Sequence, residues 1–106
     1  MPVTEAARIV NQNGHLIVSG DLNFLTVPLL WEQSLPLLSA YLELNFDLEK
    51  VTSSNSAGIA LLIEWIKYAE NSHKKINFYH ISPQLSSIMN ALGVSLDIVD
   101  GSLKNR

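Results

Sequence analysis

The feature that most constrains the fold is an abrupt change from polar to apolar residues between Val51 and Trp65. Residues 52–56 are all Thr, Ser or Asn, whereas residues 57–63 contain only apolar side chains and one glycine. Ser and Asn cap helices well because their side-chain oxygens accept hydrogen bonds from the free N–H groups of the first turn. The change therefore predicts the start of a helix. A surface helix usually keeps a broad polar face, so we expect the first turns of this helix to be covered on two sides.

A regular alternation of apolar and polar residues precedes this helix. It places Leu42, Leu44, Phe46 and Leu48 on one side and Glu43, Asn45 and Asp47 on the other. A period of two is typical of a strand with one buried face. We expect this strand to be central in its sheet, with Leu44 and Phe46 buried and Asp47 near its end.

The N-terminal part predicts a hairpin. Ala7 to Val10 suggests a short strand, and Asn13-Gly14 is a strong signal for a two-residue hairpin turn. His15 to Ser19 then forms the returning strand, which we expect to end at Gly20.

A loop and a helix follow the hairpin. Residues 21–25 suggest a loop, with Leu22, Phe24 and Leu25 as candidates for exposed apolar side chains. Thr26 can cap a helix that carries Pro28 in its first turn, where a missing N–H has no cost. Pro36 predicts a kink or an end, since it removes a hydrogen bond to the carbonyl four residues earlier. The expected apolar face consists of Val27, Leu30, Trp31, Leu35 and Leu38.

The C-terminal part continues the alternation of strands and helices. We expect a strand over residues 76–80, a helix opened by Ser82-Pro83 and ended by Gly93, and a short extended segment over residues 96–99. The apolar face of that helix comprises Leu85, Ile88, Met89 and Leu92. This order favours the α/β class, with a mixed, mainly parallel β-sheet, helices packed on it and an N-terminal β-hairpin. We expect one domain over residues 1–100 and a flexible tail over residues 101–106.

Composition excludes several classes of function. The net charge of −3 gives no electrostatic reason to expect nucleic acid or an anionic membrane as a partner. There is no cysteine, no signal-like N-terminus and no apolar run long enough to span a bilayer. The three histidines lack metal-ligand spacing, and no phosphate-binding glycine loop or catalytic motif occurs. We therefore expect a cytoplasmic protein that is not an enzyme, binds no metal or cofactor and does not insert into a membrane.

Two segments resemble the signature of STAS domains (sulfate transporter and anti-sigma factor antagonist). They are Phe-Asp-Leu-Glu-Lys-Val at residues 46–51 and Asn-Ser-Ala-Gly-Ile-Ala-Leu-Leu at residues 55–62. The signature is a strand ending in Asp-Leu, a short loop, and Asp-Ser/Thr-small-Gly-Leu at the start of a helix. The segments 19–22 and 27–32, with the pair Trp31-Glu32, are similar to the MlaB-type branch of this family.

The resemblance implies a binding module without catalytic activity. MlaB-type subunits bind the ATPase subunit of an ABC transporter that moves phospholipid between the membranes of Gram-negative bacteria and maintains outer-membrane lipid asymmetry. Permease and lipid-binding subunits complete that complex, so the chain is expected at the inner membrane only through its partner. The partner-binding residues implied by the resemblance are Phe24, Ser54, Asn55, Ser56, Ala57, Gly58 and Ile59. Ser56 matches the Ser/Thr that anti-sigma factor antagonists have phosphorylated, whereas Asn55 departs from the usual Asp.

Other interpretations remain open at this point. The chain could be an anti-sigma factor antagonist switched by phosphorylation of Ser56, although the missing acidic neighbour counts against it. It could bind a small ligand such as a nucleotide or lipid at the helix start, yet residues 53–60 include no basic side chain to hold a phosphate. Ser54, Asn55 and Ser56 could also be helix caps only. Trp31 and Trp65 are expected in the core, and Phe24 is the better candidate for an exposed contact.

Overall fold

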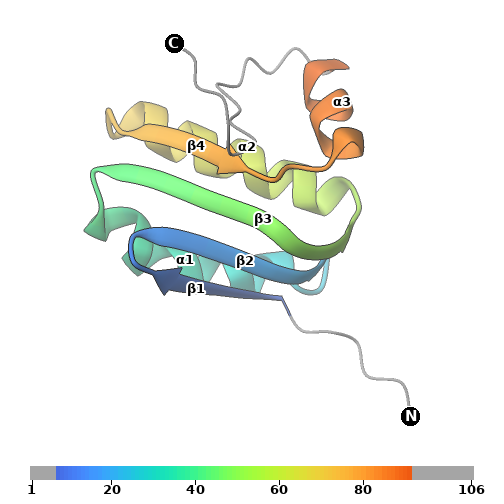
Figure 1. Ribbon diagram of the computed structural model, residues 1–106, viewed down its shortest axis with the longest axis horizontal. Helices are drawn as coiled ribbons and strands as arrows, with labels where there is room; N and C mark the ends of the chain where they lie inside the picture. The colour runs from blue at the N-terminus through green and yellow to red at the C-terminus, as the bar shows by residue number, and fades with distance from the viewer. Residues whose placement is uncertain (1–6, 92–106) are drawn as a thin grey trace.

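The computed structural model describes residues 7–91, which form a four-stranded sheet with three helices (Figure 1). In chain order the elements are β1 (Arg8–Gln12), β2 (His15–Leu22), α1 (Val27–Ala40), β3 (Glu43–Ser54), α2 (Ser56–Asn71), β4 (Lys75–Tyr79) and α3 (Pro83–Ala91). The strand order is β1-β2-β3-β4, with β1 antiparallel to β2 and the other neighbours parallel. The predicted α/β class with a mixed sheet is confirmed. The expected segment 96–99, the helix end at Gly93, Leu92 and the tail lie outside the described residues.

The N-terminal hairpin forms where the sequence predicts it. Asn13 and Gly14 have positive φ angles of 55° and 88°, as a two-residue type I′ turn requires. The returning strand does not end at Gly20 but continues to Leu22. Gly20 has a φ of +92° and lies beside an irregularity in the pairing with β3. Its conformational freedom lets the strand continue through this distortion.

The core lies between the sheet and helices α1 and α2, which share one face of the sheet (Figure 1). Leu44, Phe46 and Leu48 are buried as predicted, but Leu42 is 87% exposed because β3 begins only at Glu43. Trp65 is fully buried and stacks on Phe46 with ring centroids 4.1 Å apart. The predicted core position of Trp65 is therefore confirmed, whereas Trp31 is half-buried at the margin.

Helix α1 differs from expectation in two ways. It continues past Pro36 to Ala40, so the prediction that it could stop there is wrong. Pro36 lies on the exposed side, where water can satisfy the carbonyl that loses its partner. Leu35 is 40% exposed, and Ser34 takes the inward position because its hydroxyl accepts a hydrogen bond from Trp65 Nε1 at 3.0 Å.

Strand β3 is longer than the alternation predicts. It occupies the predicted central place between β2 and β4 and continues through the polar residues to Ser54. Asp47 therefore lies in the middle of β3 and not near its end, although it is the last β3 residue paired with β4. Within residues 7–91, no helix is both long and apolar enough to cross a membrane.

Candidate functional site

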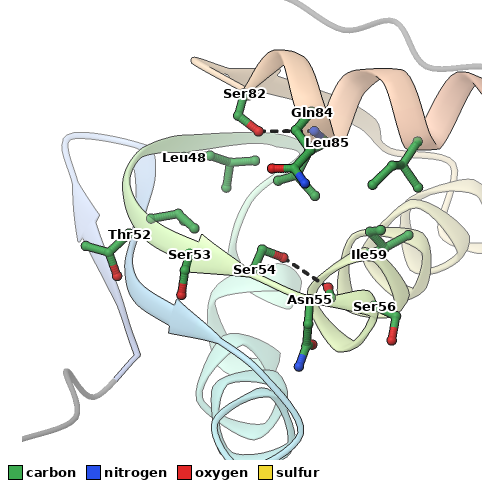
Figure 2. Close-up of a pocket in the computed structure, with 12 residues that line it drawn as sticks. Leu48, Thr52, Ser53, Ser54, Asn55, Ser56, Ile59, Ser82, Gln84 and Leu85 are labelled. Atoms are coloured by element: carbon green, nitrogen blue, oxygen red, sulfur yellow. Dashed lines mark hydrogen bonds between the residues drawn. The ribbon is translucent and has the colours of Figure 1, made fainter.

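The candidate site lies at the edge of the sheet toward which β2, β3 and β4 all run, although β4 ends opposite Asp47, before β2 and β3 do. These strands are mutually parallel, so the segments that follow them gather at the same edge. We call this region the carboxyl edge: the β2–α1 loop, the start of α2 and the start of α3 (Figure 1). It contains a pocket of about 470 Å³ between β3, α2 and α3 (Figure 2).

Asn55 connects the start of α2 to the sheet. Its side-chain oxygen accepts a hydrogen bond from Ala57 N at 2.8 Å, and its carbonyl accepts one from Gly58 N at 2.9 Å. Its own N–H donates to the Leu22 carbonyl at 3.1 Å. Asn55 is therefore the N-cap of α2 and fixes the helix start against the end of β2.

Ser54 and Ser56, the neighbours of this cap, have different roles. The Ser54 hydroxyl donates to the Asn55 carbonyl at 3.1 Å. Ser56 is the first residue of α2, and its side chain is exposed. The hydroxyl of Ser56 is thus presented to solvent at the positive end of the helix dipole.

The pairing of β2 with β3 is irregular in the segment that leads into α2. The register shifts after Ile17 and again after Gly20, so β3 carries extra residues opposite β2. In a regular strand Thr52 and Ser53 would point to opposite faces, but here both hydroxyls donate to Asp21 Oδ1, that of Ser53 at 3.0 Å. A bulge explains this geometry, because it turns two successive residues toward one partner.

Gly58 has a steric role at the first turn of α2. A Cβ atom at this position would lie 2.1 Å from Ser54 Oγ and 2.9 Å from Leu22 Cβ. Leu22 itself is 1% exposed, which corrects the expectation that it is an exposed loop residue. It belongs to β2 and packs against the helix start. The signature glycine therefore permits close contact between α2 and the ends of β2 and β3.

The β2–α1 loop presents two apolar side chains to solvent. Phe24 is 69% exposed and Leu25 is 86% exposed. Their loop is fixed by Asn23, whose side-chain oxygen accepts from Leu25 N at 2.9 Å and Thr26 N at 3.1 Å. The Thr26 side chain makes no capping bond to α1, contrary to expectation, because its oxygen accepts from Asn23 N at 2.9 Å while its hydroxyl donates to the Asp21 carbonyl at 2.7 Å.

The pocket contains side chains that the sequence alone did not assign to the site. Its apolar lining combines Leu48 and Val51 of β3, Ile59 of α2, and Leu85 and Ile88 of α3. Its polar lining consists of Thr52, Ser53, Ser54, Asn55, Ser56, Ser82 and Gln84. Helix α3 reaches the pocket because it follows β4, which is parallel to β3. The sequence indicates this only through the order of its strands and helices.

The structure divides the predicted partner-binding residues into two groups. Phe24, Asn55 and Ser56 are exposed, and Ser54 is half-buried. Ala57, Gly58 and Ile59 are buried, although Ile59 also lines the pocket. The accessible part of the predicted site is therefore narrower than the signature segment. Ala57 and Gly58 position the helix start and are not exposed for contact.

A second group of polar side chains lies near the end of the β3–β4 pairing at Asp47 and Tyr79. Ligand atoms of Asp47, Glu49 and His80 are all within 4.8 Å of one another, and His80 Nδ1 is 3.0 Å from Asp47 Oδ1. Sequence reasoning missed this group because His80 is distant from the two carboxylates along the chain. Such a set could ligate a divalent cation, yet Glu49 and His80 are exposed, and the hydrogen bond from Glu49 N to Asp47 Oδ1 already orders it at 2.9 Å.

The mixed sheet, the capped helix and the exposed serine at its start are the arrangement of a STAS domain. The chain matches the family model described as "Mlab, STAS domain" over residues 5–100 and therefore belongs to this family. The resemblance to an MlaB-type STAS domain that the sequence shows is therefore confirmed.

Solved structures agree on the fold. The anti-sigma factor antagonist SpoIIAA in its unphosphorylated form has a TM-score of 0.70 and 13% identity, over 92% of this chain and 90% of that one. An anti-sigma factor antagonist from Mycobacterium paratuberculosis has a TM-score of 0.64 and 18% identity, over 84% of this chain and 78% of that one. At these identities the likeness concerns the fold alone. No curated protein matches the chain.

Proposed function

We propose that this chain is a non-catalytic, cytoplasmic STAS subunit that binds the ATPase of an ABC phospholipid transporter through its carboxyl edge. The observation that carries the proposal is the joint exposure of Phe24 and Ser56 at one edge of an MlaB-type STAS domain. The chain would be held at the inner membrane by this partner and would support the assembly and activity of the transporter.

The geometry of the edge supports a protein partner. The exposed Phe24 and Leu25 lie in a loop ordered by Asn23, and Asn55 N joins the β3–α2 connection to the end of β2. An ordered apolar pair costs little conformational entropy when it is covered. Aromatic side chains are also frequent anchors in protein interfaces.

The test of this proposal is a charge at Ser56. Helix α2 has no acidic residue in its first turn, so a carboxylate there should stabilise the helix by about 0.3–1 kcal/mol. A docked partner would remove that carboxylate from water, and an unpaired buried charge is costly. We expect Ser56→Glu to retain the thermal midpoint and to weaken binding of the purified ATPase at least tenfold, or about 1.4 kcal/mol.

Two variants control this experiment. Ser56→Gln has almost the same shape as Ser56→Glu without the charge, and Ser56→Ala only removes a hydroxyl. Both should bind more tightly than Ser56→Glu in the same titration. Normal binding by Ser56→Glu would place the interface elsewhere, and unfolding would mean that Ser56 is not at an accessible position. Failure to recover an ATPase with the wild-type chain from its native host would contradict the proposal itself.

A second candidate function is that of an anti-sigma factor antagonist switched by phosphorylation. The exposed hydroxyl of Ser56 favours it, since a kinase could reach this atom without unfolding the helix. The adjacent Asn55 is neutral where the family signature has Asp. Gene neighbours encoding a serine kinase and a sigma factor would favour signalling, and so would stoichiometric phosphate on Ser56 after incubation with such a kinase and mass analysis.

A further inference from the structure

Among residues 7–91, the pocket at the carboxyl edge is lined by no charged side chain. The twelve described lining residues include no Asp, Glu, Lys, Arg or His. We propose that this pocket receives an uncharged, apolar side chain of the bound ATPase and anchors the complex. The inference rests on the proposed function and names the part of the partner that the site takes.

The chemistry of the pocket selects its occupant. Leu48, Ile59 and Leu85 are buried and form an apolar floor, and Val51 and Ile88 are half-buried around it. A charged group that entered would lose water and find no oppositely charged side chain among the described lining residues, which is unfavourable. An aliphatic or aromatic side chain would instead cover the exposed parts of Val51 and Ile88 and gain from burial.

The openness of the site favours a side chain of a protein over a free small molecule. Small-molecule pockets bury about 70–90% of their ligand, whereas Thr52, Ser82 and Gln84 around this pocket are exposed. The lining also includes Asn55 and Ser56, so the pocket is continuous with the surface proposed for docking. Anchoring side chains that fill such pockets carry much of the binding energy in protein interfaces.

Gln84 provides a direct test. It is exposed in the first turn of α3 and lines the pocket (Figure 2). Gln84→Glu changes the charge with almost no change in shape, and it should weaken ATPase binding at least tenfold. Gln84→Leu should bind within threefold of wild type. The matched control is Gln12→Glu on β1, which makes the same change at an exposed position outside the pocket and should bind within twofold of wild type.

Thiol protection gives an independent readout. The chain has no cysteine, so Gln84→Cys and Gln12→Cys each introduce a unique thiol whose modification by iodoacetate can be followed by the mass of this chain. Saturating ATPase should slow modification of Gln84→Cys at least tenfold and leave Gln12→Cys unchanged. Equal protection of both thiols would overturn the inference.

The outcomes separate the inference from the proposed function. If Ser56→Glu weakens binding while Gln84→Glu behaves as Gln12→Glu does, docking stands and the pocket is not the anchor site. If the wild-type chain binds no ATPase, both are overturned. Protection of Gln84→Cys by ATP or by detergent-solubilised phospholipid alone would also overturn the inference, in favour of a small-ligand site.

Discussion

Replacing Gly58 by alanine tests how closely α2 approaches the sheet. The new Cβ atom would be 2.1 Å from Ser54 Oγ, 2.9 Å from Leu22 Cβ and 3.3 Å from Leu22 Cδ1. The Ser54 hydroxyl can rotate away, but Leu22 Cβ is fixed by the backbone of β2. Alanine at this position therefore requires a shift of the helix or the strand.

The expected change in the free energy of unfolding is the difference between a steric cost and a gain in helix propensity. Overpacking a well-packed site costs about 1–3 kcal/mol. Alanine is favoured over glycine inside a helix by about 1 kcal/mol at most, and the first turn gains less. We expect Gly58→Ala to lower the free energy of unfolding by about 1–2 kcal/mol.

Urea denaturation of matched variants measures this difference. Ala60→Gly, at an exposed position of the same helix, gives the propensity contribution without a steric change. Adding Ser54→Ala to Gly58→Ala should recover part of the loss, because it removes the nearest atom but leaves Leu22 in place. The reasoning is refuted if Gly58→Ala stabilises the protein by about as much as Ala60→Gly destabilises it.

Two further predictions concern single hydrogen bonds, each measured by urea denaturation. Ser34→Ala should lower the free energy of unfolding by about 1–3 kcal/mol, since it leaves the buried Trp65 Nε1 without its acceptor. The exposed Ser39→Ala in the same helix should change it by less than about 0.5 kcal/mol, and equal effects would contradict the role of Ser34. Asn55→Ala should cost about 1 kcal/mol through loss of the α2 cap. An unchanged stability would mean that the Ala57 N–H is satisfied equally well by water.

Local signals in the sequence correctly predicted several elements. The Asn13-Gly14 turn, the buried alternation of Leu44 and Phe46, and the Asn55 cap each depend on residues adjacent in the chain. Turn geometry, pleat and capping are local properties, so one segment contains the information that they need. The signature also identified the family, because its glycine and its exposed serine occur at a fixed spacing.

The predictions that failed concern residues whose conformation depends on segments far away in the chain. The sequence predicts Leu22 in a loop, but pairing with β3 extends β2 to this residue. The Leu22 side chain is then buried beneath Gly58. Thr52 and Ser53 read as part of a helix-cap loop, yet their bonds to Asp21 keep them in β3. Long-range pairing and side-chain contacts outweigh local propensity in a sheet.

The sequence by itself determined the class of fold, the family and the position of the signature serine. Only the tertiary structure decided which of the predicted contact residues are accessible and that α3 completes the pocket beside them. The physical reason is the direction of the strands: β2, β3 and β4 are parallel, so the segments that follow them gather at one edge of the sheet. Residues far apart in the chain meet there, and only packing decides which of them remain exposed.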